Sequence, residues 1–154
     1  MKIGGLVENS DLTMYRITSI KDEPGAAAEI LRVFAQEKIS LQYITESAIP
    51  GATAVMSLCV DTKQAERIDK LFVEYDQIMK QIKIKKIDNV SIIGIYSPHF
   101  REKPILLAKF CESLGTAGIN ILGLSSSISS INSVIDSKQL LYAKNALLEK
   151  FELP

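Results

Sequence analysis

The 154-residue sequence has no tryptophan, one histidine and two cysteines, and these shortages exclude several kinds of site. Cys59 and Cys111 have no Cys/His cluster beside them, so the sequence predicts two thiols in a reducing compartment rather than a zinc site. His99 has neither a nucleophile nor a carboxylate partner, and we expect it in a surface loop. The sequence therefore predicts no catalytic residue, no metal and no cofactor.

Net charge and long apolar runs are also missing. Lys+Arg and Asp+Glu number 18 each, so no net field attracts nucleic acid or anionic lipid. The apolar runs are too short for a membrane-spanning helix, and MKIGG at 1–5 is unlike a secretory signal. The serines at 125–127, 129 and 130 lack the setting of a nucleophile elbow and indicate exposed strand faces. We expect a cytoplasmic globular protein with neither nucleic acid nor membrane as a partner.

What the sequence does contain is an internal repeat. VDTKQ at 60–64 recurs as IDSKQ at 135–139, and each copy ends an apolar stretch and opens an amphipathic one. Asp61 or Thr62 in the first copy, and Asp136 or Ser137 in the second, is predicted to cap a helix. The helical positions that we expect to be buried are Ala65, Ile68, Phe72 and Tyr75 in the first copy, and Leu140, Ala143, Leu147 and Phe151 in the second.

The repeat extends upstream. Pro24 and Pro104 are each predicted to begin a helix, since proline suits the first helical turn. The predicted buried faces of these helices are Ala27, Ile30, Leu31 and Phe34, and Leu107, Phe110, Cys111 and Leu114. Strands are predicted before them at 14–20 and 90–95 and after them at 39–44 and 119–124. Both halves then read strand, helix, strand, strand, helix, as expected for a duplicated α+β unit.

The fourth strands determine the predicted topology. The alternating segment 81–85 completes the first repeat, and the segment 2–7, ahead of a predicted turn at 8–11, is expected to complete the second. The predicted fold is α+β, with two ferredoxin-like βαββαβ units whose antiparallel four-stranded sheets carry helices on one face. Repeat one (11–87) is inserted in a discontinuous repeat two (1–10 and 88–154). The alternative is a disordered N-terminus.

Four segments carry a resemblance to a known family. KDEPGAA within 19–28 resembles the D-x-P-G-x-A-A loop that opens ACT domains, and 39–45 resembles the I-N-I-D-x-I segment that follows it. Segment 118–136 is similar to the second ACT domain of aspartokinases, and 146–153 resembles the close of that region. The resemblance covers essentially the whole sequence, which contains no G-x-x-x-x-G-K-[ST] loop and nothing that matches the kinase domain.

The resemblance implies a regulatory module that is not itself an enzyme. In the family, an effector amino acid binds where ACT units pair, which implies a homodimer. The chain is then either a stand-alone regulator or the regulatory part of a larger enzyme, with a separate catalytic subunit as its partner. The alternative function is a ligand-free dimerisation or docking module.

The loop before the first helix is the predicted site. Its helix N-terminus attracts a carboxylate, and Asp22 and Glu46 suit an ammonium group. The resemblance implies that Asn120 and Ile121 in the second repeat of a partner chain complete the site. The predicted ligand-binding residues are Lys21, Asp22, Glu23, Pro24, Gly25, Ala26, Ala27, Thr45, Glu46, Ser47, Asn120 and Ile121.

Each of these positions also has a purely structural interpretation. Asp22 and Glu23 suit a helix cap, Gly25 a turn, Glu46 a solvated strand end and Asn120 the end of a strand.

The sequence departs from the family pattern in both repeats. Ser40 and the pair Glu46 and Ser47 replace family amides, and the added charge of Glu46 favours a cationic or zwitterionic ligand. Loop 96–105 has Ile105 where the first loop has glycine, so we expect a site only at the first loop.

Overall fold

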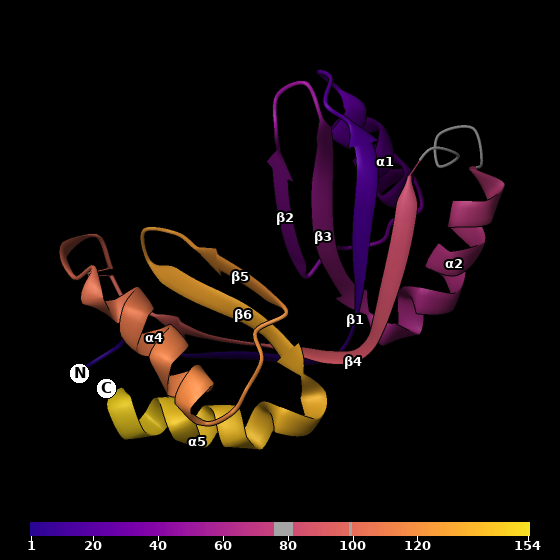
Figure 1. Ribbon diagram of the computed structural model, residues 1–154. Coiled ribbons are helices and arrows are strands. Elements are labelled where there is room, and N and C mark those ends of the chain that lie inside the picture. The colour runs from indigo at the N-terminus through magenta and orange to yellow at the C-terminus, as the bar shows by residue number, and fades with distance from the viewer. Residues whose placement is uncertain (76–81, 99) are drawn as a thin grey trace. The chain divides into compact units, whose positions relative to one another are not determined.

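The computed structural model describes residues 1–75, 82–98 and 100–154. Its elements are β1 (Gly5–Lys21), α1 (Ala26–Gln36), β2 (Tyr43–Ala48), β3 (Thr53–Asp61), η1 (Thr62–Gln64), α2 (Ala65–Glu74), β4 (Lys83–Tyr96), η2 (Phe100–Glu102), α4 (Ile105–Thr116), β5 (Gly123–Ser126), β6 (Ser130–Asp136), η3 (Ser137–Gln139) and α5 (Leu140–Lys150). One six-stranded sheet has the order β2-β3-β1-β4-β6-β5 (Figure 1). The α+β class is confirmed, whereas the expectation of two separate four-stranded sheets is wrong.

The chain divides into two compact units. Unit 1 consists of Met1–Asp11 and Asn89–Pro154, and unit 2 of Leu12–Asp88. Two long strands, β1 and β4, contribute residues to both units. Each long strand merges two strands that the sequence predicts separately, so six strands replace the expected eight.

The predicted turn at 8–11 is wrong, because β1 runs through it. Residues 8–11 are polar and have low strand propensity on their own, but the neighbouring strand β4 in the sheet stabilises them in a strand. The N-terminus is ordered rather than disordered: Lys2 forms a parallel bridge with Glu152, and the Ile3 amide donates to the Glu152 carbonyl at 3.0 Å. Gln81, predicted to start a strand, lies outside the described residues.

Helices α1 and α4 end in the same way. Lys38 and Gly118 have positive φ values of 56° and 74°, and the residue after each donates its amide to the carbonyl five positions back, Ile39 to Phe34 and Ile119 to Leu114, both at 2.9 Å. This is a Schellman motif, in which the apolar residue after the left-handed position packs against the helix. The predicted strands at 39–44 and 119–124 are therefore displaced, and β2 and β5 begin at Tyr43 and Gly123.

The two copies of the short repeat also adopt the same local structure. Asp61 accepts a hydrogen bond from the Lys63 amide, and Asp136 accepts one from the Lys138 amide, both at 2.9 Å. The predicted capping aspartates are confirmed. The hydroxyl that follows each aspartate bonds to a hydroxyl on the long strand that leads into the first helix of its own unit. The pairs are Thr62 with Thr13 at 3.1 Å and Ser137 with Ser91 at 2.7 Å.

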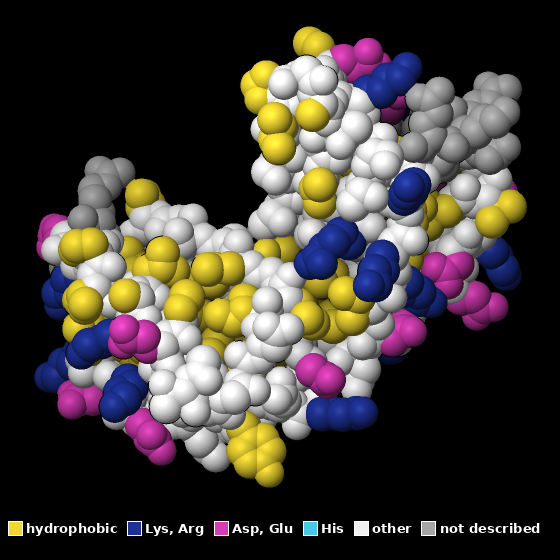
Figure 2. Space-filling model, viewed as in Figure 1, with side chains coloured by type: hydrophobic (Ala, Val, Ile, Leu, Met, Phe, Trp, Pro, Cys, Tyr) yellow, Lys and Arg dark blue, Asp and Glu magenta, His cyan; other side chains and the backbone are white. Residues whose placement is uncertain are grey.

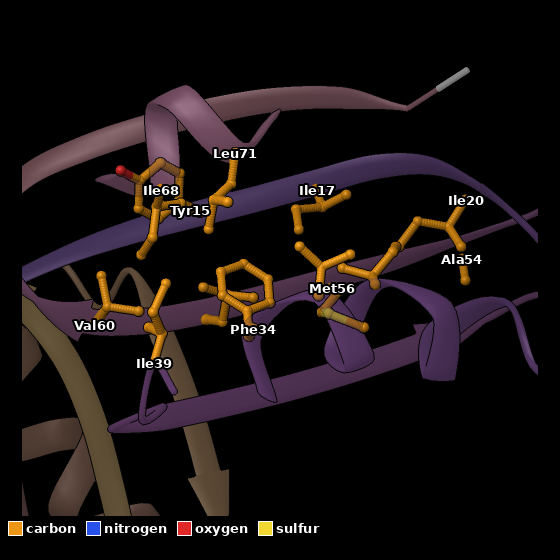
Figure 3. Close-up of a cluster of buried hydrophobic side chains, with 13 residues drawn as sticks. Tyr15, Ile17, Ile20, Phe34, Ile39, Ala54, Met56, Val60, Ile68 and Leu71 are labelled. Carbon is orange, nitrogen blue, oxygen red and sulfur yellow. The ribbon is translucent and has the colours of Figure 1, made fainter. Parts of the chain in front are cut away.

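The core of unit 2 lies between one face of its sheet and helices α1 and α2 (Figure 3). Ile30, Phe34 and Ile68 are buried as predicted, and Phe72 lies at the edge of the cluster. The Phe72 ring makes edge-to-face contacts with Tyr15 and Phe34, at centroid distances of 5.5 and 6.1 Å. Such contacts stabilise aromatic pairs beyond simple burial.

Unit 1 has its own core, formed by β4, β6, α4, α5 and residues near both termini. Phe110, Leu114, Ala143, Leu147 and Phe151 are buried as predicted. The predicted buried Leu107 is wrong, because that side chain is 37% exposed and its neighbour Leu106 is buried instead at 1%. Residues 105–107 are all apolar, so the sequence alone does not show which face of this helix is buried.

One buried tyrosine joins strand and helix in unit 2. The Tyr15 hydroxyl donates to the Ala65 carbonyl at 3.1 Å and to Asp69 Oδ1 at 2.8 Å. Lys86 Nζ on β4 donates to Asp69 Oδ2 at 2.8 Å, and this hydrogen bond raises the pKa of Lys86. Burial, and then the bond to Asp69, raise the pKa of Tyr15 above its ordinary value.

On β3, burial raises the pKa of the Cys59 thiol to about 12.

Tyr15→Phe is expected to lower the free energy of unfolding at neutral pH by about 1 to 2 kcal/mol, because the O–H that Ala65 and Asp69 share as acceptors is lost. In the unfolded chain a tyrosine ionises near pH ~10, whereas Tyr15 stays neutral in the folded chain. Its contribution to stability is therefore complete below about pH 10 and declines as the pH rises above that value. Urea unfolding of wild type and variant from pH 7 to 11 measures the difference, which should shrink above pH ~10.

Tyr142→Phe is the matched control, because Tyr142 is 69% exposed. It should follow wild type at every pH. A difference between Tyr15→Phe and wild type that stays constant across this range would contradict the assigned role of the hydroxyl.

Candidate functional site

The loop between β1 and α1 has a tightly defined backbone. Strand β1 reaches it through a bulge between Ile17 and Ile20, at which Ser19 has a positive φ of 62°, and Lys21 makes the last pair with Thr53. Bulges commonly redirect a strand beside a functional site. The Glu23 amide donates to the Lys21 carbonyl at 3.0 Å, and the Glu23 carbonyl accepts from the Ala26 amide at 3.2 Å. These bonds fold Asp22, Glu23 and Pro24 into a turn that leads directly into α1.

Helix α1 begins without a side-chain cap. Gly25 is the residue before the first turn, with φ 88° and ψ −7°, and no side chain accepts a capping hydrogen bond there. The interpretation of Asp22 and Glu23 as caps is therefore wrong, and both side chains are exposed. Added to Gly25, a Cβ would meet nothing within 4 Å, so a ligand has open access to this backbone. Uncapped amides and the helix dipole together favour a bound carboxylate.

The register of unit 2 brings β2 to the same end of the sheet. Ala48 pairs with Ala54 on β3, and Ala54 pairs with Ile20 on β1, so β1 and β2 run parallel with their C-terminal ends on one rung. The loop at 22–25 and the end of β2 therefore lie at one end of the sheet. Strand β2 is an edge strand, and its outer backbone groups have no partner strand in the described sheet.

Thr45, Glu46 and Ser47 do not share one face. Glu46 pairs with the core residue Met56 and lies on the face that α1 and α2 cover, whereas Thr45 pairs with Ser57 and lies on the opposite face with Ser47. Glu46 is inside the strand and not at its end, which corrects the sequence interpretation. Glu46 therefore lies on the same side of the sheet as α1, two residues before the end of β2.

Asn120 and Ile121 belong to the other unit. They follow the Schellman motif of α4 and precede β5, where Asn120 is exposed and Ile121 packs at the edge of the unit 1 core. The loop of unit 1 that corresponds to 22–25 differs from it. Pro104 with φ −60° precedes α4, η2 occupies Phe100–Glu102, and Ile105 is 51% exposed. His99 lies outside the described residues.

A groove of about 690 Å³ between α4 and α5 was missed by sequence reasoning. Lys109 and Glu112 of α4 and Tyr142 and Glu149 of α5 line it, and their charges are mixed. Tyr142 could have pointed to this groove, but its exposure is seen only when the buried face of α5 is known. Over the described ranges, no group of three or more His, Cys, Asp or Glu residues is placed to hold a metal ion. None of the helices described is both long and apolar enough to cross a membrane.

The fold is one that known regulatory proteins share. The regulatory subunit of aspartate kinase from Thermus thermophilus, in its ligand-free form, matches 97% of this chain and 99% of its own length with a TM-score of 0.86 at 19% identity. A structure of aspartokinase alpha and beta subunits matches with a TM-score of 0.84 at 22% identity, over 96% of this chain and 97% of that one. E. coli aspartokinase III in complex with lysine and aspartate matches with a TM-score of 0.67 at 12% identity, over 96% of this chain and 32% of that one.

Sequence comparison agrees with the fold. The aspartokinase of Mycolicibacterium smegmatis is 24% identical over 155 residues, which cover 97% of this chain. The chain spans 36% of the length of that relative. No protein-family model matches the chain. The chain therefore resembles an ACT-type regulatory region of aspartokinases, as the sequence motifs predict.

Proposed function

We propose that this chain is a regulatory module that binds an amino acid, and that it consists of two ACT repeats, at 11–87 and at 1–10 with 88–154. The matching Schellman motifs, capping aspartates and hydroxyl pairs of the two units support a duplication. The module acts on a catalytic domain or separate subunit and carries out no reaction itself. The regulatory subunits among the similar structures support this role.

One observation carries the proposal: the N-terminus of α1 has no side-chain cap and lies at the end of the sheet at which the edge strand β2 also ends. The Ala27 amide and the open backbone at Gly25 face a ligand carboxylate, and Ala26 lies beside them with its own amide bonded to the Glu23 carbonyl, while Asp22 and Glu46 face the ammonium groups of the ligand. Glu46 makes the site favour a cationic or zwitterionic effector. Lys21, Glu23 and Pro24 shape the loop, and Thr45 and Ser47 border the edge.

The site is completed by a second copy of the chain. The edge of β2 and the segment of Asn120 and Ile121 belong to different units, and we propose that they meet across a homodimer. An effector then stabilises one arrangement of the paired chains. Its effect on a partner is limited by its differential affinity for the two arrangements.

The test is thermal unfolding of the purified chain with each of the twenty amino acids, lysine first, since lysine is bound in one similar structure. At about a hundred times its dissociation constant, an effector should add about 2.7 kcal/mol of stability. For a chain of this length this is a rise in Tm of roughly 5 to 11 °C. Asp22→Ala should abolish the rise, and Asp11→Ala, which removes an exposed carboxylate that belongs to unit 1, should not.

The second candidate is a ligand-free dimerisation or docking module. The edge strand β2 favours it, because Ile44 in this strand is 42% exposed and Ile49, just after the strand, is 69% exposed. Under this candidate the chain is a dimer in sedimentation experiments, and no amino acid raises its Tm. That result would overturn the sensor proposal.

A further inference from the structure

The groove between α4 and α5 of unit 1 is lined by charges of both signs. Lys109 and Glu112 come from α4, and Glu149 and Lys150 come from α5. Among the described residues, none of these four side chains has an ion-pair partner. Figure 2 shows positive and negative side chains interspersed over these two helices. The groove of about 690 Å³ therefore presents unpaired charges to whatever binds there.

The two units can be aligned residue by residue through their shared motifs. The Schellman bonds align Ile39 after α1 with Ile119 after α4. The capping aspartates align Asp61 before α2 with Asp136 before α5. Each position on the helices of one unit then has an equivalent on the helices of the other.

The equivalent groove of unit 2 is bridged by its own side chains. Arg67 Nη2 on α2 donates to Glu37 Oε2 at the end of α1, at 2.7 Å. The equivalent positions in unit 1 hold Tyr142 and Ala117, which cannot form an ion pair. The groove between α1 and α2 has a volume of about 280 Å³, less than half that between α4 and α5. The open groove is therefore a feature of unit 1 alone within this duplicated fold.

The charges on α1 are the reverse of those on α4. Glu29 and Arg32 of α1 are equivalent to Lys109 and Glu112 of α4. Both members of the α1 pair are exposed, and neither has an ion-pair partner among the described residues. In each helix the two charges are three residues apart, which is about 4.5 Å along the axis. The charges of α1 therefore match those of α4 in spacing and oppose them in sign.

The outer face of α1 is also narrow. Ala28 and Ala35 are exposed and lie on one stripe with Arg32, at helical positions i, i+7 and i+4. Small side chains let two packed helices approach closely, because the distance between helix axes depends on the side chains at the contact. Helix α1 therefore has both the shape and the charges to enter a groove between two helices.

We infer that the α4–α5 groove binds helix α1 of a second copy of this chain. Lys109 meets the partner's Glu29, and Glu112 meets the partner's Arg32, as charge-assisted pairs. Each copy provides one α1 and receives one, so the two contacts close a two-fold dimer. This inference rests on the homodimer proposed above, because it too joins unit 2 of one copy to unit 1 of the other. The loop of the proposed effector site leads directly into α1, so an effector bound there acts on the helix that holds the dimer together.

The experiment measures the dimer dissociation constant of the full chain by sedimentation equilibrium, without any amino acid. Glu29→Lys and Lys109→Glu should each raise it at least about tenfold, because each substitution places like charges at both contacts of the dimer. An equimolar mixture of the two variants should recover the wild-type value. In the mixed dimer each contact again joins opposite charges, which a contact within one chain would not produce.

Glu66→Lys is the matched control, since Glu66 is the exposed acid in the first turn of α2, as Glu29 is in the first turn of α1. It should change the dissociation constant less than about twofold, as expected for an exposed charge. Circular dichroism checks the fold of each variant. If one of the first pair does not fold, Arg32→Glu mixed with Glu112→Arg provides the same test at the second contact.

The possible results separate this inference from amino-acid binding. A wild-type chain that is a monomer would overturn both this contact and the proposed homodimer. A dimer that the charge reversals leave unchanged, that Glu66→Lys weakens equally, or that the mixture does not restore would overturn this contact alone. Neither result would affect the rise in Tm that an amino-acid effector is expected to cause.

Discussion

Gly94→Ala is expected to lower the free energy of unfolding by about 3 kcal/mol or more, the upper range of overpacking effects. A Cβ at this position would press against the Ile131 carbonyl and lie 2.5 Å from Asn132 Oδ1, across the pairing of β4 with β6. The carbonyl is backbone inside a ladder and cannot rotate away. The substitution must therefore distort the centre of the unit 1 sheet. Chemical denaturation followed by circular dichroism measures the loss.

Gly5→Ala is the control for this prediction. It lies at the start of β1, and an added Cβ would meet nothing within 4 Å. We expect a change smaller than about 0.5 kcal/mol. Similar losses at both glycines would show that the tight contact at Gly94 has no special role.

Leu106→Ala is expected to cost about 2 to 5 kcal/mol, whereas Leu107→Ala should cost less than about 1 kcal/mol. The two leucines are adjacent on α4, but Leu106 is 1% exposed in the unit 1 core and Leu107 is 37% exposed. Truncation of the first leaves a cavity that the packed core cannot close. Truncation of the second removes surface that water already reaches.

Urea unfolding of both variants tests which face of α4 is buried. A larger loss for Leu107→Ala would mean that the helix buries the face predicted from sequence and not the face that the structure shows. Leu148→Ala, at a 38% exposed position of α5, should behave like Leu107→Ala and serves as a second exposed comparison.

Local chemistry made much of this fold predictable. The aspartates at 61 and 136 cap because their side chains reach the amide two residues on, and this needs no knowledge of the rest of the chain. Helices α1, α2, α4 and α5 follow from their apolar spacing, and the loop before α1 follows from Pro24 and Gly25. That part of the candidate site could be located from the sequence.

Features that depend on partners distant in sequence were not predictable. Ile39 and Ile119 look like strand residues, yet each closes a helix, because the left-handed residue before it turns the chain back. Residues 8–11 look like a turn, yet the sheet holds them in β1. The opposite directions of Thr45 and Glu46 require the strand register, which composition does not encode.

The discontinuity of unit 1 has a consequence for how the chain is made. Unit 2 is contiguous, so it can fold as soon as it leaves the ribosome, whereas the first eleven residues must wait for the second half of the chain. The Glu152 amide donates to the Met1 carbonyl at 2.8 Å, so this contact joins the two segments of unit 1 across the whole of unit 2 in the sequence. Contacts of such long sequence separation form slowly. The nascent chain therefore exposes the face of α4 that packs in the unit 1 core until α5 has emerged, and unit 1 is open to misassembly for longer than unit 2.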